Sequence, residues 1–515
     1  MTDPDTSAAE PARESIARRA GLIALGTLAS RLLGLLRDRV IASTFAVGAT
    51  DAFWLAFTIP NALRVLLAEG ATSGAFVPVL TDVREKRGQE AASRVFAKLA
   101  GAMVLLLLVV AAIGSFAAPL LVRLYASGFE AGRYDEAVRL TRVVFPYVAL
   151  VGSAAMVMGA LHTAKRFAVA AFAPAMLNVA LIAACLFFAS EGAGTMVLAI
   201  GALIGGALHL LVQLPSLRRA SYSLRPRLDL KDPDVRRAFR LLLPLLIALG
   251  VYQLNIVASR QLASHLGEGA ISYLFYGQRL VEIPQGVFAL AIGSAALPNL
   301  AEYAARNDLE GAKALFRSSL CLTLFVAVPS AVGLAMLAEP LVDALLGAGE
   351  FGAHEISETA RSLVFLAAGV WAVASVRTVV PMFHSLGDTR SPVVASAFNL
   401  VVFFGVSMLT MGTMGHAGLA LAIALAAAVQ LIVLLTMLRR RIGALRLGEV
   451  ALRTLRFVLA AALMGGALYA LRDFRGLAAL ALKVAVGAIT YGAAAWVLRV
   501  PELRAVTNRL RRRRS

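Results

Sequence analysis

Three arginines lie well inside long apolar runs of this chain, where a positive charge is costly. They are Arg31, Arg64 and Arg279, and each is followed directly by an apolar residue. A charged side chain at mid-membrane depth costs roughly 3 kcal/mol or more, so it indicates function by default. The guanidinium group stays charged, and its planar fork of donors matches phosphate oxygens. These residues therefore indicate a water-filled site for an anion, most readily a phosphate or diphosphate.

Carboxylates are few around these arginines. Asp51 and Glu69 share the stretch "DAFWLAFTIPNALRVLLAEGATSGAFVPVL" with Arg64, and Glu282 follows Arg279 by three residues. That spacing allows an ion pair within one helix, which is an alternative to ligand binding by Arg279. We expect the three carboxylates to be charge or gating partners. A cation-coupled exporter would instead line its cavity with carboxylates.

The first apolar run contains the unusually charged segment "SRLLGLLRDRV". Arg37 follows Arg31 by six residues, which puts the two on different faces of a straight helix. They could face one small ligand only if the helix bends, and Gly34 between them could permit a bend. We expect Arg37 and Asp38 to be charge or gating partners and Gly34 to be a hinge.

Prolines mark two of the runs that hold these charges. A proline inside a helix removes a backbone hydrogen bond and kinks the helix, and alternating access needs such compliant positions. The alternative, ordinary packing of helices through small residues, stays open. The expected hinges are Pro60, Pro78, Pro284 and Pro298.

The composition shows which elements must position these side chains. Of the 515 residues, 59% are hydrophobic and only 16% are charged, and the mean hydropathy is +0.77. About 20 apolar residues cross the hydrocarbon core as a helix, and backbone in lipid must be helical or form a closed barrel. The ten-residue alternation of a barrel is absent from the sequence. We expect an all-α integral membrane protein with about fourteen transmembrane helices.

Basic residues gather in alternate connections between the runs, and this orients the chain. Residues 82–98, 218–240 and 439–456 hold five, eight and six Lys or Arg, whereas the opposite connections "ASEGAG" and "SHLGEG" hold none. By the positive-inside rule the basic set is cytoplasmic, so both termini are expected inside the cell. The net charge of +19 is then explained by orientation and contact with lipid headgroups, and we expect no nucleic-acid partner.

Two parts of the chain resemble each other at a fixed offset. The stretch that begins "GATDAFW" matches the one that begins "GAISYLF", and Asn178 matches Asn399, both 221 residues apart. The tripeptide "ASR" also recurs, ending at Arg31 and Arg260. The 221-residue offset holds six expected spans, an even number, so the two halves run in the same direction. Such a parallel repeat is one design of secondary transporters, with the substrate site between the halves near mid-membrane.

The repeat predicts two six-helix bundles related by a parallel pseudo-two-fold axis, followed by two extra C-terminal helices. The interface between the bundles would bring the three arginines of the apolar runs to one cavity. The expected parts are a cytoplasmic tail at 1–18, an N-terminal bundle at 19–217, a basic cytoplasmic linker at 218–236, a C-terminal bundle at 237–438, an extra helix pair at 450–498 and a basic cytoplasmic tail at 499–515.

Catalytic and metal-binding motifs are absent from the sequence. It contains no Walker A, HExxH or GxSxG segment. Its six histidines are scattered, and Cys185 and Cys321 match no metal or redox spacing. We expect a transporter and not an enzyme, with no metal and no cofactor; the identity of any coupling ion cannot be read from these residues.

The segments that hold the arginines resemble the signatures of a known family. "SRLLGLLRDRVIASTFAVGATDAFWLAFTIPNALRVLLAEGATSGAFVPVL" and "YGQRLVEIPQGVFALAIGSAALPNL" are similar to motifs of the MurJ/MviN family of bacterial lipid II flippases, in the multidrug/oligosaccharidyl-lipid/polysaccharide exporter superfamily. The resemblance implies a multi-pass inner-membrane protein. It would move lipid II, undecaprenyl diphosphate bearing the disaccharide-pentapeptide, to the periplasmic leaflet by alternating access, for peptidoglycan synthesis, cell wall biogenesis and cell shape.

The resemblance also implies roles for individual residues. On the matching positions, Arg31, Arg64 and Arg279 would hold the diphosphate and sugar. Ser30 and Ser272 would be further positions of the substrate site. The extra helix pair would form a groove for the polyprenyl tail. The implied partners are lipid II, membrane lipids and other cell-wall synthesis proteins.

One departure from the family pattern lies beside the site. Val65 stands where members often have a second arginine, so any role of that arginine is lost or moved. Two alternatives stay open: a flippase for another polyprenyl-diphosphate oligosaccharide, which shares the arginine chemistry, and a cation-coupled drug exporter, which does not.

Overall fold

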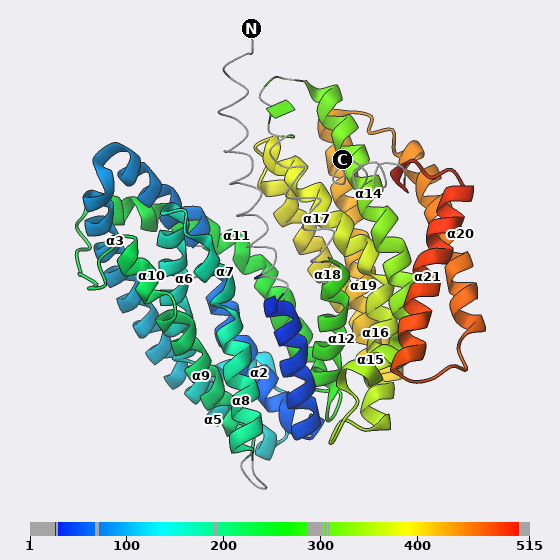
Figure 1. Cartoon of the computed structure of the whole chain (residues 1–515), viewed down its shortest axis with the longest axis horizontal. Helices are drawn as coiled ribbons and strands as arrows, with labels where there is room; N and C mark the ends of the chain where they lie inside the picture. The colour runs from blue at the N-terminus through cyan, green and yellow to red at the C-terminus, as the bar shows by residue number, and fades with distance from the viewer. Residues whose placement is uncertain are drawn as a thin grey trace. The chain divides into compact units, whose positions relative to one another are not determined.

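The computed structural model describes residues 26, 29–66, 72–189, 194–285, 300, 302–303, 306 and 308–503 (Figure 1). Across these residues the secondary structure is helical, so the predicted all-α fold class is confirmed. Contacts divide the chain into two compact units. Unit 1 comprises Met1–His265 with Ala348–Glu350, and unit 2 comprises Leu266–Gly347 with Phe351–Ser515.

Unit 1 begins, among the described residues, with a helix over residues 29–44. The elements that follow the first helix are α2 (Val47–Arg64), the π-helix η2 (Thr72–Phe76), α3 (Val77–Phe116), α4 (Ala118–Tyr125), α5 (Ala131–Val144), α6 (Tyr147–Thr163), α7 (Phe167–Phe172), α8 (Ala175–Phe188), α9 (Met196–Leu211), α10 (Leu214–Arg219) and α11 (Pro233–Ala263). Inside the unit, α2 packs on α5 and α6, α6 packs on α3 and α9, and α8 lies beside α9.

The elements of unit 2 are α12 (Ala270–Pro284), α14 (Leu309–Met336), α15 (Ala338–Leu346), α16 (Ala353–Ala368), α17 (Val370–Ser385), α18 (Arg390–Met414), α19 (His416–Ile442), α20 (Leu447–Ala470) and α21 (Leu477–Val497). Part of its core lies where α14 meets α20 and α21. Phe325 of α14 contacts the rings of Phe457 and Tyr491, at 5.6 and 5.4 Å between centroids, and the Tyr491 hydroxyl donates to the Phe325 carbonyl at 2.7 Å.

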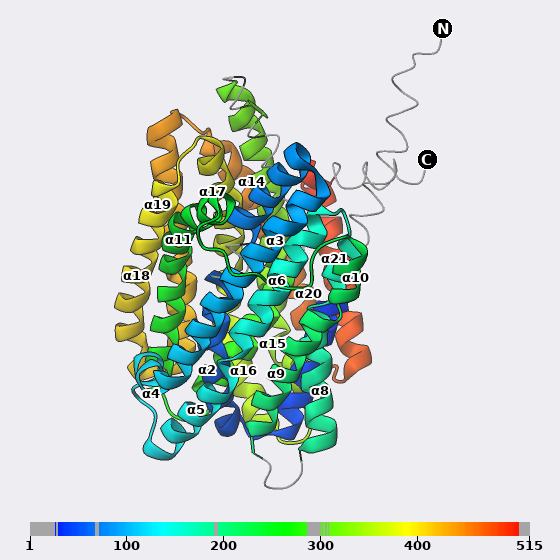
Figure 2. The same ribbon diagram turned by 90° about the vertical axis from the view of Figure 1, so that its left-hand side faces the viewer.

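Glycines with positive φ angles produce one sharp reversal of the chain and one kink within a helix. Gly415 is the single residue between α18 and α19, and its φ of +60° is a conformation that glycine adopts most easily. The two helices therefore run side by side (Figure 2). Gly88 has a φ of +81° and breaks the helical path inside α3. Residues 82–98, expected as a basic connection, are thus helical on both sides of one kink.

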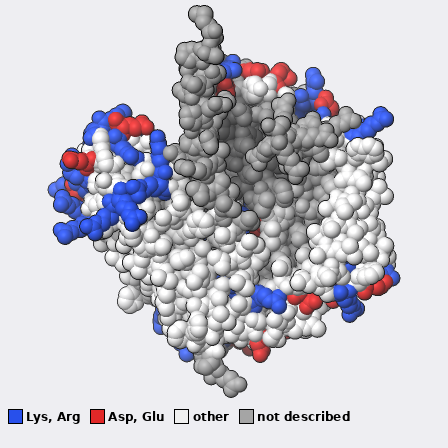
Figure 3. Space-filling view, viewed as in Figure 1, with Lys and Arg blue, Asp and Glu red and all other residues white. Residues whose placement is uncertain are grey.

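The lengths and composition of the helices fit a membrane protein. Within the described residues, eight helices are long and apolar enough to cross a bilayer, or nine if α16 and α17, bent by 44° relative to each other, form one span. The count of fourteen stays a prediction. On the face shown in Figure 3, the charged side chains of each unit gather toward the ends of its helices and leave a largely uncharged band between them, as lipid contact requires.

The expected hinge prolines occupy different local settings. Pro60 lies buried inside α2, and Pro284 lies at the end of α12. Pro78 is the second residue of α3, directly after the π-helix η2. Pro298 falls outside the described residues. Hinge motion at these positions stays a prediction.

Candidate functional site

A buried charge cluster links the first helix to α8 in unit 1. Arg37 is 5% exposed and Asp38 is 1% exposed. The Arg37 Nε and Nη2 atoms both donate to Asp38 Oδ1, at 2.9 and 2.5 Å, and Nη1 donates to Asn178 Oδ1 at 3.0 Å. The guanidinium carbon also lies 5.7 Å from the centre of the Trp54 ring. Arg37 is therefore held by protein groups on several sides, as a charge partner would be.

Arg31 lies on a different part of the same helix surface. Residues 29–44 form one continuous helix, so Gly34 does not break it in this structure. Arg31 is half-buried, and no ion pair or side-chain hydrogen bond joins it to another described residue. Ser30 is also half-buried, and its carbonyl accepts a hydrogen bond from Asn178 Nδ2 at 3.0 Å. The guanidinium of Arg31 thus has donors to offer to a ligand.

Arg64 ends α2 at the point where the helix changes character. Its Nε donates to Asn61 Oδ1 at 2.8 Å, and the side chain is half-buried. Residues 65 and 66 continue as π-helix, a geometry that is frequent at functional sites. His209 of α9 lies within electrostatic range of Arg64, and its buried Nε2 has no hydrogen-bond partner among the described residues. The spacing of histidines in the sequence gave no sign of this proximity.

Asp51 is fully buried in α2, where the sequence could not identify its partner. Arg260 of α11, 6% exposed, interacts electrostatically with Asp51. Arg260 ends the second "ASR" tripeptide, 229 residues after Arg31 and therefore not at the 221-residue offset of the repeat. Since neither side chain has access to bulk water, the pair balances two charges that would each be costly alone. This arrangement agrees with the expected role of Asp51 as a charge partner, which stays a prediction.

In unit 2, α12 carries the remaining predicted site residues. Arg279 is 35% exposed at its side chain, and its Nη1 lies 3.2 Å from Glu282 Oε2, so the ion pair allowed by their spacing is present. Ser272 is fully buried. Glu69 lies outside the described residues. Unit 1 holds two of the three arginines and unit 2 the third, and a cavity shared by all three stays a prediction.

One histidine of unit 2 is bonded at both ring nitrogens. His416, the first residue of α19, lies 2.7 Å from Ser362 Oγ through Nδ1 and 2.7 Å from Glu358 Oε2 through Nε2. Glu358 also pairs with Arg361 at 3.2 Å. Ser362, His416 and Glu358 are linked in the order of a catalytic triad. Ser362 is 0% exposed, however, so no substrate can reach its hydroxyl. The cluster joins the start of α19 to α16.

We expect His416→Ala to destabilise unit 2. The substitution leaves a buried hydroxyl and a largely buried carboxylate without their partner, at a cost of about 1–3 kcal/mol. Thermal unfolding in detergent measures this. His384→Ala, at an exposed site at the end of α17, is the matched control. Equal melting temperatures for the two variants would contradict the structural role of His416.

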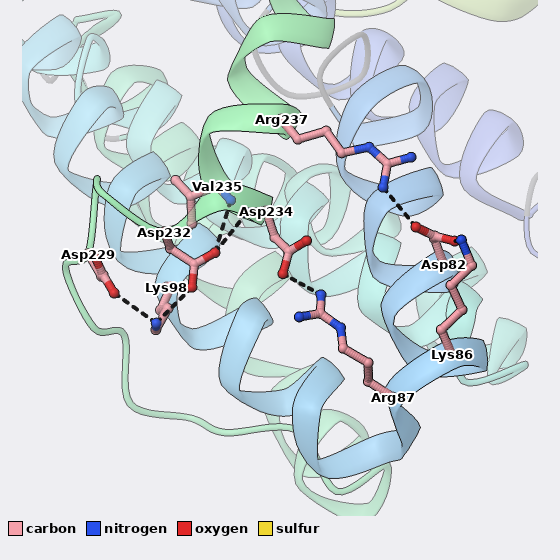
Figure 4. Close-up of polar contacts among 9 residues, drawn as sticks. All are labelled: Asp82, Lys86, Arg87, Lys98, Asp229, Asp232, Asp234, Val235 and Arg237. Atoms are coloured by element: carbon pink, nitrogen blue, oxygen red, sulfur yellow. Dashed lines mark hydrogen bonds and ion pairs between the residues drawn. The ribbon is translucent and has the colours of Figure 1, made fainter.

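Ion pairs fasten the start of α11 to α3 within unit 1 (Figure 4). Lys98 Nζ lies 2.7 Å from both Asp229 and Asp232, Arg237 lies 2.7 Å from Asp82, and Arg87 pairs with Asp234. Asp232 also caps α11, because its carboxylate accepts from the first backbone N–H groups while Pro233 occupies the first turn. These contacts hold the basic connection against the basic end of α3.

The far end of α11 is also bonded to unit 1. The backbone N–H of Ser127 donates to Gln261 Oε1 at 3.0 Å, and the N–H of Gly128 donates to Ser264 Oγ at 3.1 Å. The sequence repeat begins the second half at α11, yet its contacts belong to unit 1. The position of the boundary between the two bundles stays a prediction.

We expect Lys98→Ala to loosen the segment before α11. The hydrogen bond from Lys98 lowers the pKa of Asp229, so this carboxylate stays charged at neutral pH. The contact is present above the ordinary pKa of aspartate, near 3.9, and is lost as the pH falls through the lower folded value. Hydrogen exchange at residues 229–235 should be faster in Lys98→Ala at pH 7. Lys86→Ala, 73% exposed and paired within its own helix, should leave it unchanged.

The part of the chain that the structure describes contains no group of three or more His, Cys, Asp or Glu that could hold a metal ion. Cys185 and Cys321 are both buried thiols. The chemistry concentrated in these residues is that of arginines and their partners, which suits recognition of an anion and not bond cleavage.

Comparison with solved structures places this arrangement in one class of membrane protein. A structure described as a lipid II flippase MurJ in an inward closed conformation is 23% identical, covers 93% of this chain and 98% of its own, and has a TM-score of 0.78. An inward-facing multidrug resistance MATE family transporter of the MOP superfamily is 17% identical and covers 81% of this chain and 95% of its own, with a TM-score of 0.66. The chain therefore shares the all-α fold of these two membrane transporters.

Sequence comparison narrows the class to one family. The model of the family described as "Lipid II flippase MurJ" matches residues 24–481. A lipid II flippase MurJ of Burkholderia cenocepacia is 35% identical over 81% of this chain and 82% of its own length. A probable lipid II flippase MurJ of Bdellovibrio bacteriovorus is 33% identical over 94% and 95%. The chain belongs to the lipid II flippase MurJ family, as its motifs predict.

Proposed function

We propose that this protein flips lipid II across the bacterial inner membrane, from the cytoplasmic to the periplasmic leaflet, for peptidoglycan synthesis. The observation that carries the proposal is the family match over residues 24–481. The residues agree with it, because arginines in or beside membrane helices suit a lipid with a diphosphate headgroup. A flippase for another polyprenyl-diphosphate oligosaccharide would use the same arginines and is the second candidate.

The mechanism that fits these residues is alternating access. Arg31, Arg64 and Arg279 bind the diphosphate from the cytoplasmic side, the two bundles rock, and the headgroup leaves on the periplasmic side. Each negative charge that moves outward gains about 2.3 kcal/mol per 100 mV of inside-negative potential. The membrane potential therefore drives the step in the required direction. Ser30 directly precedes Arg31 and would contribute its hydroxyl to the same site. Ser272 lies two helical turns before Arg279 and is fully buried, so it would reach the headgroup only in another conformation of the transporter.

The lipid tail would be accommodated by the last two helices. α20 and α21 pack on α14 through buried side chains and expose apolar ones, such as Leu455, Leu459 and Leu463 at the spacing of one helix face. Such a surface can contact a polyprenyl chain while the headgroup moves. This groove lies outside the repeat, so its geometry need not be duplicated in the N-terminal half.

Orientation and partners complete the proposal. The basic segments, which include the ion-paired connection before α11, would face the cytoplasm with both termini. Membrane lipids surround the protein, and other cell-wall synthesis proteins would supply or receive its substrate.

Complementation tests the proposal. A bacterial strain depleted of its own lipid II flippase should resume growth and regain its cell shape when this chain is expressed. Membrane insertion is checked by a C-terminal fusion. If the inserted protein fails to rescue while a related family member succeeds in the same strain, the substrate assignment is wrong.

A further inference from the structure

A single asparagine joins two turns of the charged first helix. The Asn178 side chain accepts from Arg37 Nη1 through Oδ1, at 3.0 Å, and donates through Nδ2 to the Ser30 carbonyl, also at 3.0 Å. Ser30 and Arg37 are seven residues apart, close to two helical turns, so both contacts lie along one face. Asn178 itself is 5% exposed. One buried amide therefore fixes this helix to α8 at two levels.

Gly34 lies on the same face of the first helix as these two residues. It stands four residues after Ser30 and three before Arg37, and it is buried. The helix is continuous through Gly34, and a hinge at this residue stays a prediction.

The chemistry of the amide is specific to this place. Arg37 and Asp38 form a pair that is almost completely buried, and such a pair is stable only when its remaining donors are satisfied. Asn178 supplies an acceptor to the Arg37 guanidinium and a donor to the Ser30 carbonyl, which is part of the backbone of the first helix. An alanine could do neither, and an aspartate could do only the first because it has no donor.

The second half of the chain provides a comparison. Asn399 stands 221 residues after Asn178, at the matching position of the repeat. Its Nδ2 donates to Gln430 Oε1 at 3.2 Å, and Gln430 Nε2 donates to Ser396 Oγ at 3.2 Å. Here the asparagine meets neutral groups and is only half-buried. The two asparagines thus share ancestry and differ in what they hold.

We propose that Asn178 is a positioning residue for the anion site, and that it acts through the first helix. Arg31 directly follows Ser30, so the amide that holds the Ser30 carbonyl also fixes the turn that presents Arg31. Through Arg37 the same amide prevents that helix from rotating about its axis. The inference rests on the proposed function, because it takes Arg31 to be a ligand of the diphosphate.

The test separates headgroup recognition from general stability. Purified full-length protein is titrated with undecaprenyl diphosphate and, separately, with undecaprenol, which has the same tail and no charge. Asn178→Ala should weaken diphosphate binding about tenfold, because Arg31 is no longer held in position, and should leave undecaprenol binding unchanged. Asn178→Asp, which keeps the Arg37 contact and loses the Ser30 contact, should weaken diphosphate binding as well.

Asn399→Ala is the matched control and should bind both lipids as the wild type does. If Asn178→Ala weakens both lipids equally, or matches Asn399→Ala, Asn178 has no positioning role and the inference is overturned. If the wild type itself does not prefer the diphosphate to undecaprenol, the proposed function fails and the inference fails with it. The two failures are distinguished by the wild-type titration alone.

Discussion

Replacing Arg31, Arg64 or Arg279 by alanine should abolish rescue of a strain depleted of its lipid II flippase. Each side chain can form charge-assisted hydrogen bonds to phosphate oxygens, worth about 1.5–3 kcal/mol each. Loss of one arginine should lower the affinity for lipid II by about 10- to 100-fold. A lysine at the same position keeps the charge and loses the planar fork, so it should restore growth only in part. Growth after depletion and binding to purified protein measure the effect.

The control for this series is an arginine outside the proposed site. Arg123, at the end of α4, is exposed and lies 5.9 Å from the Tyr134 ring. Arg123→Ala should rescue growth fully. If all three site variants also rescue fully at wild-type protein levels, the arginine site does not exist as described.

Replacing Asp51 by asparagine should destabilise unit 1 strongly. The change leaves the buried guanidinium of Arg260 without the negative charge of Asp51, and breaking a buried ion pair typically costs about 3–5 kcal/mol. Asp51→Asn should therefore lower the melting temperature in detergent and reduce the amount of protein in the membrane. Asp135→Asn, on an exposed face of α5, should change neither.

A double-mutant cycle tells a paired charge from an independent one. Arg260→Gln alone should also be destabilising, because it strands Asp51. The double variant Asp51→Asn with Arg260→Gln should be more stable than the sum of the single losses predicts. Additive losses would show that the two residues do not act as a pair.

Much of the fold could be predicted from the sequence because membrane helices leave a strong signal. The lengths of the apolar runs and the absence of barrel alternation were sufficient for the all-α fold class. The second bundle was expected to begin at residue 237, close to Pro233, where α11 begins. Breaks were harder to predict. The sequence did not predict that α3 continues through Gly88 with a kink there, because a basic, polar segment is interpreted as a connection whether or not it is helical.

The anion site itself stays a prediction, and the sequence did not foresee the contacts that surround its residues. The arginines could be identified because charge in an apolar run is rare. Asn178 could not, because an uncharged amide in a span gives little signal and its partners Arg37 and Ser30 lie more than 140 residues away in the sequence. Arg260 ends a recurring "ASR" tripeptide, yet its link to Asp51 depends on how α11 packs, which no spacing rule specifies.

Reconstitution tests the central claim most directly. Purified protein is placed in liposomes that contain fluorescent lipid II, and the fraction of lipid II accessible on the outer surface is followed with time under an imposed membrane potential, negative on the side from which lipid II departs. The wild type should increase that fraction well above protein-free liposomes, and Arg64→Ala should not. Equal rates for the wild type, Arg64→Ala and empty liposomes would contradict the assignment of this protein as a lipid II flippase.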